Sequence, residues 1–90
     1  MAYRQSIVDV CSYGHLELLN LILEDPEADP SIDGNLPLKV AVANSHPAIV
    51  ARLLADPRID PNAVYLQEIR SDSDEDIAIM LRLARLLARP

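Results

Sequence analysis

Apolar residues recur along this chain at spacings of three and four, which is the period of an amphipathic α-helix. Four short stretches with this pattern are 7–13, 16–24, 38–44 and 47–55. A Gly or a Pro lies at or near one end of each stretch, and these residues favour the ends of helices. A longer stretch with the same period runs from 74 to 89. The pattern predicts an all-α protein of short helices.

The segment 15–30 can be laid over the segment 46–61 without a gap, at an offset of 31 residues. His15 matches His46, the paired apolar positions coincide, and so do two Asp-Pro dipeptides in each segment. A fixed period of this size is typical of repeat proteins, whose units bury their apolar faces only against their neighbours. The sequence therefore predicts that the two segments stack as equivalent helix pairs.

The period divides a single domain, 1–90, into three units of roughly 3–30, 31–61 and 62–90. Pro37 is well placed to open the first helix of the second unit, because its missing N–H would have no partner there.

The second unit resembles an ankyrin repeat. The likeness rests on Gly34, Pro37-Leu38, Ala41, His46, Ile49-Val50 and Leu53-Leu54, and the first unit keeps Gly14-His15, Leu18-Leu19 and Ile22-Leu23. The resemblance implies an ankyrin-repeat solenoid of about two and a half to three helix-turn-helix units, with the last helix as a C-terminal cap.

Several positions depart from the family pattern. Leu36 stands in place of the usual capping Thr, Lys39 in place of the usual His, and Ser45 in place of the usual Gly at the turn. Val42 occupies a position where a second Ala is common, and Asp-Pro-x-x-Asp-Pro replaces the usual loop. Some of the hydrogen bonds that tie neighbouring family turns together are therefore expected to be missing.

Three sets of residues invite a chemical interpretation. The resemblance implies that His15 and His46 hydrogen-bond backbone and pin the turns, with no metal. The acidic residue of each Asp-Pro pair is expected to start a turn by bonding to nearby backbone. These residues are Asp25, Asp29, Asp56 and Asp60. Cys11, the single cysteine, allows no internal disulfide and is expected in the core. We therefore expect no catalytic residue, no metal site and no cofactor, and the protein is not predicted to be an enzyme.

Composition narrows the function further. The net charge is −6, with fourteen acidic and eight basic residues, and nucleic-acid binding requires the opposite sign. No segment has the length of a membrane span, and the N-terminus lacks a secretory apolar region. The expected protein is soluble and cytoplasmic.

The acidic run 71–76 predicts the start of a helix. The alternatives are a phosphorylation site at Ser71 or Ser73 and a weak cation site.

The last helix divides into three sectors on a helical wheel. One apolar sector, expected to pack on the second unit, holds Ile77, Leu81, Ala84, Leu87 and Ala88. A basic sector holds Arg82, Arg85 and Arg89, and a third, apolar sector turned away from the first holds Ile79, Leu83 and Leu86. Either the first helix of the third unit covers Met80, Leu83 and Leu86, or the third sector is a surface that binds a second copy or a partner. An offset of 33 aligns 84–88 with 51–55.

The predicted function is recognition of another protein, neutral or basic, through loop tips and the faces of the first helices. The alternative is a structural subunit that self-associates through its last helix. The resemblance maps the partner contacts to Arg4, Ser12, Tyr13, Ile32, Asp33, Asn35, Ala43, Asn44, Val64 and Leu66. Tyr13 is the strongest of these candidates, because tyrosine is favoured at the centres of interfaces.

Overall fold

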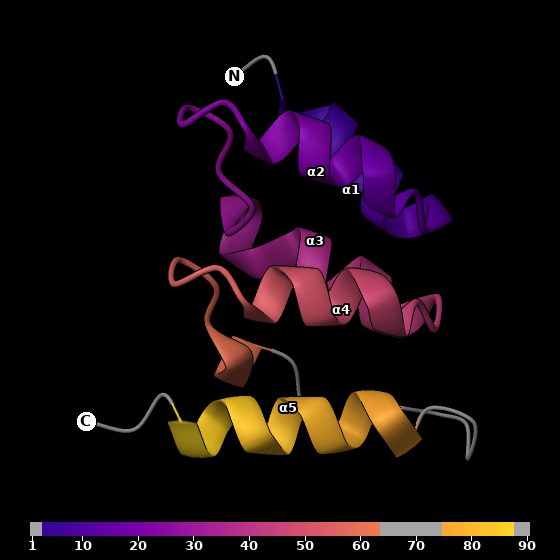
Figure 1. Ribbon diagram of the computed structural model, residues 1–90, viewed down its shortest axis with the longest axis vertical. Coiled ribbons are helices and arrows are strands. Elements are labelled where there is room, and N and C mark those ends of the chain that lie inside the picture. The colour runs from indigo at the N-terminus through magenta and orange to yellow at the C-terminus, as the bar shows by residue number, and fades with distance from the viewer. Residues whose placement is uncertain (1–2, 64–74, 88–90) are drawn as a thin grey trace.

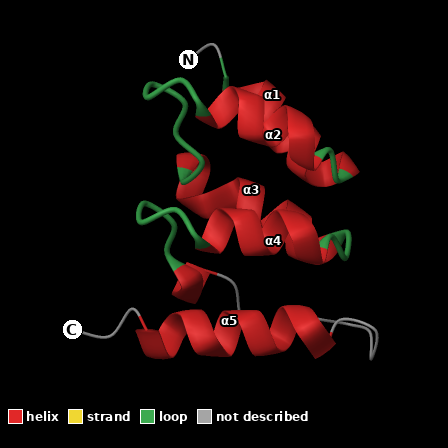
Figure 2. Cartoon of the chain, viewed as in Figure 1, coloured by secondary structure: helices red, strands yellow, loops and turns green. Residues whose placement is uncertain are grey.

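The computed structural model describes residues 3–63 and 75–87, and this part of the chain contains helices and no strand (Figure 2). The helices are α1 (Arg4–Tyr13), α2 (Leu16–Leu23), α3 (Ile32–Ala43), α4 (Pro47–Leu54), the short 3-10 helix η1 (Pro61–Ala63) and α5 (Glu75–Leu87). The all-α prediction is confirmed for these residues.

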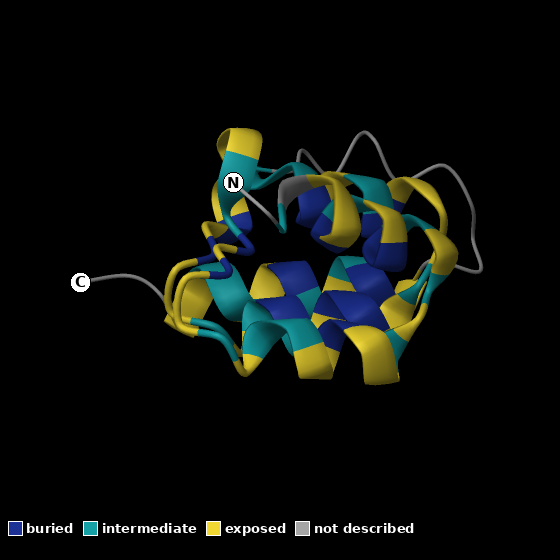
Figure 3. Cartoon of the chain, turned by 90° about the horizontal axis from the view of Figure 1, so that it is seen from above, coloured by how far each residue is buried: buried dark blue, intermediate teal, exposed yellow. Residues whose placement is uncertain are grey.

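Two helix pairs lie one above the other along the longest axis, and α5 closes the opposite end of the stack (Figure 1). Helix α1 contacts α2 within the first pair and α3 in the next, and α4 contacts both α2 and α5. The helices form two rows, one with α1 and α3 and the other with α2 and α4. Seen along the stack, the buried positions lie on the helix faces that turn toward the space between these rows (Figure 3).

The core is aliphatic and follows the 31-residue period. Its buried apolar members are Ile7, Val10, Cys11, Leu19, Ala28, Leu38, Ala41, Val42, Ile49, Val50, Leu53, Ile59, Ile77 and Leu81. Ile7 and Leu38 are equivalent under the period, as are Leu19 and Val50, and all four are fully buried. These two pairs of positions are therefore buried alike, as stacking of sequence copies requires, whereas Leu18 is 49% exposed and its equivalent Ile49 is buried.

The turns inside the two pairs share one backbone geometry. Gly14 adopts a left-handed conformation with φ 77°, and Ser45, 31 residues later, has φ 58°. In each turn the following histidine N–H donates to the carbonyl five residues earlier: His15 to Val10 at 2.9 Å and His46 to Ala41 at 3.0 Å. Ser45 thus occupies a conformation that glycine adopts without strain.

Helix α3 begins with an irregular segment. Three consecutive residues, Asp33, Gly34 and Asn35, have φ values of 55°, 66° and 66°, so the right-handed helix follows them. Pro37 lies in the first turn of that right-handed part and is buried. In a regular helix the N–H of this position would donate to the Asp33 carbonyl. Because Asp33 is left-handed, the missing N–H of Pro37 removes no regular helical bond. The sequence prediction that Pro37 opens a helix agrees with this geometry.

The four loop aspartates behave as the turn chemistry predicts. The Oδ1 atoms of Asp25, Asp29, Asp56 and Asp60 each accept a hydrogen bond from the backbone N–H two residues later, at 2.9 Å in every case. The two Asp-Pro loops are therefore built alike, and their carboxylates serve backbone geometry.

The loops also tie the units to one another. The Arg58 guanidinium donates to both carboxylate oxygens of Asp56, and its Nη1 reaches across to the Ala28 carbonyl at 2.9 Å. In the first loop, the Tyr3 hydroxyl donates to Asp25 Oδ2 at 2.5 Å. These contacts hold the loop edge of the stack in a defined conformation.

Three of these carboxyl groups have pKa values below the usual range, each chiefly because of a hydrogen bond to a neighbouring side chain. The donors are Tyr3 for Asp25, Ser31 for Asp29 and Arg58 for Asp56. A lowered folded-state pKa contributes stability that is complete above the unfolded value, about 4. That contribution is lost as the pH falls through the folded-state pKa values.

We therefore expect the free energy of unfolding to fall as the pH is lowered below about 4, measured by urea titration at several pH values. Asp29→Asn keeps an oxygen that can accept from the Ser31 N–H and removes the titration, so its stability should depend less on pH in this range. An equal pH dependence in the two proteins would contradict the assignment to Asp29.

The last helix packs differently from the sequence prediction. Ile77 and Leu81 are buried as expected, but Leu87, placed in the same packed sector, is 85% exposed. Under the offset of 33, Leu86 is equivalent to Leu53, yet Leu86 is 61% exposed and Leu53 is fully buried. This offset is wrong as a packing register, because Leu53 lies in the core whereas Leu86 lies on an exposed side of α5. Ala88 and Arg89 lie outside the described residues.

Candidate protein-interaction surface

The predicted contact residues fall into two groups at opposite ends of the first helices. Ser12 and Tyr13 end α1, and Ala43 and Asn44 lie at the equivalent end of α3, beside the turns. Ile32, Asp33 and Asn35 lie at the other end of α3, next to the loops. The side chain of Arg4, and all of Val64 and Leu66, lie outside the described residues.

The first group forms what we call the turn edge: Ser12, Tyr13, Ala43 and Asn44. Tyr13 is 71% exposed, and its ring lies 6.2 Å from the ring of His15, centroid to centroid. Ala43 and Asn44 are exposed, and Ser12 is half-buried. An exposed aromatic ring beside small and polar side chains is a composition that suits protein recognition.

Hydrogen bonds within and between the two units hold the turn edge. His46 Nε2 lies 2.9 Å from the Ser12 carbonyl oxygen, and because a carbonyl only accepts, Nε2 carries the proton. The Asn44 side-chain amide donates to the Val40 carbonyl at 2.9 Å and to Ser12 Oγ at 3.5 Å. The backbone-pinning role predicted for His46 is confirmed by this contact.

Gly14 fits directly against the same imidazole. A Cβ atom at this position would lie 2.8 Å from His46 Nδ1, which is too close for an ordinary contact. The small residue therefore serves two purposes here: it accepts the left-handed backbone, and it leaves room for the histidine of the next unit.

In the second group, Asn35 has a structural role that the sequence analysis did not predict. Asn35 Oδ1 accepts a hydrogen bond from the Asp60 backbone N–H at 3.0 Å, which joins the start of α3 to the second loop. Asn35 is only partly exposed, as is Ile32, whereas Asp33 is exposed. A substitution at Asn35 would therefore alter the stack as well as any contact surface.

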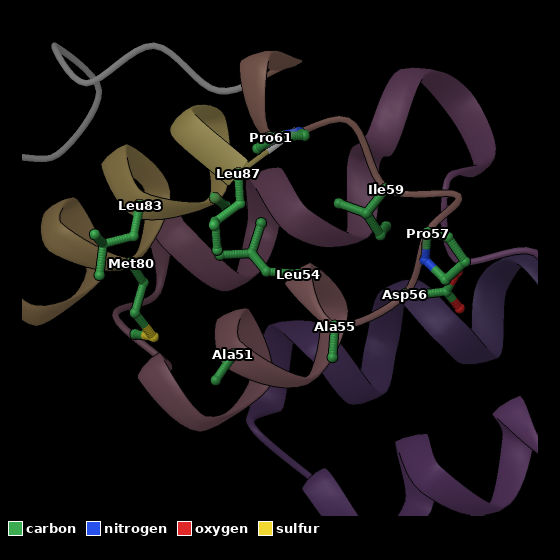
Figure 4. Close-up of a pocket in the computed structure, with 11 residues that line it drawn as sticks. Ala51, Leu54, Ala55, Asp56, Pro57, Ile59, Pro61, Met80, Leu83 and Leu87 are labelled. Atoms are coloured by element: carbon green, nitrogen blue, oxygen red, sulfur yellow. The ribbon is translucent and has the colours of Figure 1, made fainter. Parts of the chain in front are cut away.

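A separate apolar groove lies between α4 and α5. It has a volume of about 640 Å³, and its walls include Leu54 from α4, Ile59 from the second loop, Pro61 from η1, and Met80 and Leu83 from α5 (Figure 4). Leu87 forms part of its rim, next to Leu54 (Figure 4). The sequence analysis missed this groove, because its walls come from segments whose spacing depends on how α5 docks.

The predicted self-association residues are all exposed: Ile79, Leu83 and Leu86. Met80, which shared one alternative with them, is partly buried against the core. Leu83 lines the groove together with Met80, and the first helix of the third unit, which the other alternative expected to cover these residues, lies outside the described residues.

Metal-binding side chains and the single thiol were the remaining candidates for chemistry. Residues 3–63 and 75–87 contain no cluster of three or more His, Cys, Asp or Glu side chains that could hold a metal ion. Cys11 is buried, and burial raises the pKa of its thiol to about 12, so the thiol is protonated near neutral pH. Ser71 and Ser73 lie outside the described residues. None of the helices in the described ranges is long and apolar enough to cross a membrane.

No protein-family model matches this chain, and comparisons with curated proteins and with solved structures gave no significant match.

Proposed function

We propose that this protein is a non-catalytic, ankyrin-type repeat module that binds another protein through the turn edge. The observation that carries the proposal is Tyr13, an aromatic side chain that is 71% exposed and follows Ser12, whose backbone carbonyl accepts a hydrogen bond from His46. A rigid surface loses little conformational entropy on binding, so an exposed ring on it contributes its full contact area.

Charge limits the kind of partner. The chain carries a net charge of −6, so a neutral or basic protein would meet it without long-range repulsion. The cytoplasm is the proposed location, and no cofactor, nucleic acid or membrane forms part of the proposal.

The test is site-specific photocrosslinking. A photoreactive phenylalanine analogue replaces Tyr13 in one protein and Glu17, which is exposed on α2, in a control protein. In an extract of the source cells, the Tyr13 position should crosslink a protein that the Glu17 position does not. Tyr13→Ala combined with Ala43→Asp should reduce binding of the same protein at least about tenfold. Equal crosslinking from both positions, or none from Tyr13, would remove the proposal.

A second candidate function is that of a structural subunit that self-associates through α5. The specific observation in its favour is the exposed apolar sector formed by Ile79, Leu83 and Leu86. Apolar side chains gathered on the end of a stack are costly in water and are covered in most repeat proteins.

A further inference from the structure

Asp33 is the one aspartate of the chain that precedes a glycine. An aspartate isomerises when the backbone nitrogen of the next residue attacks its side-chain carboxyl carbon, and a side chain on that next residue hinders the attack. Four of the other aspartates precede a proline, whose nitrogen carries no proton to give up. Asp33-Gly34 is therefore the pair at which the sequence hinders this reaction least.

The structure leaves this pair accessible. Asp33 and Gly34 are both exposed, and no heavy atom lies within 4 Å of the position that a Cβ atom of Gly34 would take. Asp33 has φ 55° and ψ 46°, in the left-handed region that is unfavourable for a residue with a Cβ atom. Ring closure turns ψ of Asp33 away from this value, so the reaction requires a local opening of the segment. Opening releases the backbone strain of the closed conformation, which makes that step easier.

Two hydrogen bonds of Asn35 oppose the opening. Its backbone N–H donates to the Ser31 carbonyl at 2.9 Å, and its Oδ1 accepts from the Asp60 backbone N–H at 3.0 Å. The first bond closes the left-handed turn that contains Asp33 and Gly34, and the second joins this turn to the second loop. The rate of opening is therefore linked to the joint between the start of α3 and the second loop.

We propose that Asp33-Gly34 is a site of spontaneous modification, at which the backbone rearranges to an isoaspartyl linkage and unties the start of α3 from the second loop. The Gly34 nitrogen bonds to Asp33 Cγ, and its proton leaves with the carboxyl hydroxyl as water, which gives a cyclic imide. Water then adds to the imide carbon that was the main-chain carbonyl of Asp33, and the bond from this carbon to the Gly34 nitrogen breaks.

The product has the same composition as the original chain, but its backbone runs through Asp33 Cγ and the former main-chain carbonyl carbon is a carboxylate. Because the extra backbone atom lies between Ser31 and Asn35, the spacing that places both bonds of Asn35 is lost. The inference does not depend on partner binding at the turn edge.

The test incubates the purified protein for several weeks at physiological temperature in water that carries a heavy oxygen isotope. Each imide that hydrolyses takes up one solvent oxygen, so peptide mapping by mass spectrometry locates the reaction, and electron-transfer fragmentation identifies the isoaspartyl isomer. Asp9 and Asp76 are internal references, because both are exposed and each precedes a residue branched at Cβ. This comparison within the wild type needs no variant.

Three variants complete the experiment, and circular dichroism checks that each is folded. Asp33→Glu keeps the carboxylate but would have to form a larger ring, so it should abolish labelling at this position. Asn35→Ala removes the bond to Asp60, and Asn44→Ala is the matched control at the other end of α3.

Heavy oxygen and isoaspartate should accumulate at Asp33 and stay at background at Asp9 and Asp76. Asn35→Ala should raise the rate at Asp33 roughly fivefold, the change that loss of one hydrogen bond makes in an opening equilibrium, and Asn44→Ala should leave it unchanged. The isolated isoaspartyl form should unfold at a lower urea concentration than the unmodified form.

Labelling at Asp33 no faster than at Asp9 and Asp76 would overturn the site. Equal rates in Asn35→Ala and Asn44→Ala would overturn its link to the bonds of Asn35. An isoaspartyl form with an unchanged urea midpoint would overturn the untying of α3 from the second loop.

Discussion

Leu53→Ala should lower the free energy of unfolding by about 2–5 kcal/mol, whereas Leu86→Ala should change it by less than about 0.5 kcal/mol. Leu53 is fully buried in the core, so truncating it removes apolar contacts and leaves a cavity. Leu86 is 61% exposed, and its truncation mainly exchanges one solvated side chain for another. Urea titration followed by circular dichroism measures both values.

This pair discriminates between two packing registers for α5. The offset of 33 makes the two leucines equivalent and predicts similar losses, whereas the structure predicts a large difference. Comparable losses at Leu53 and Leu86 would contradict the packing of α5 described above. A small domain has only about 5 kcal/mol or a little more of net stability, so a Leu53→Ala protein that no longer folds counts as the large loss.

Gly14→Ala should lower the free energy of unfolding by about 2–3 kcal/mol, and Gly34→Ala by only about 1 kcal/mol. Both glycines are left-handed, with φ 77° and 66°, so a side chain is strained at either position. Only at Gly14 does the added Cβ also meet His46, whereas at Gly34 no heavy atom lies within 4 Å. The difference between the two variants therefore isolates the contact between the units.

A double-mutant cycle tests that contact directly. In a His46→Ala background the imidazole is absent, so Gly14→Ala should cost no more than Gly34→Ala does in the wild type. His46→Ala by itself should cost about 1 kcal/mol, because the Ser12 carbonyl loses its partner. Strictly additive effects of the Gly14 and His46 substitutions would show that the two residues do not meet.

The short-range patterns of the sequence predicted the helices of the repeated pairs well. The helical period predicted the C-terminal ends of α2 and α4 to within one residue, and the equivalence of Gly14 with Ser45 followed from the repeat offset alone. The turn role of the loop aspartates also follows from sequence, because an Asp-Pro turn is made by bonds two residues apart. Each of these features depends on residues close in the chain.

Contacts between distant segments could not be predicted in the same way. The bond from Asn35 to the Asp60 backbone and the reach of Arg58 to Ala28 join positions 25 and 30 residues apart. The Leu87 prediction failed because helical periodicity says which residues share a face and does not say how closely a neighbouring helix approaches each of them: Leu87 lines the groove beside Leu54 and is 85% exposed. The groove beside α5 was missed for the same reason.

The sequence by itself determined the secondary structure, the 31-residue equivalence and the chemistry of the turns, because these follow from periodicity and from bonds between near neighbours. The tertiary structure alone decided which apolar residues of α5 are buried, that His46 reaches Ser12 and excludes a side chain at Gly14, and that an apolar groove lies between α4 and α5. The physical reason is that the burial of a side chain depends on how closely the neighbouring helix approaches it. The separation between two helices is set by the packing of the whole stack, and no local spacing in the sequence encodes it.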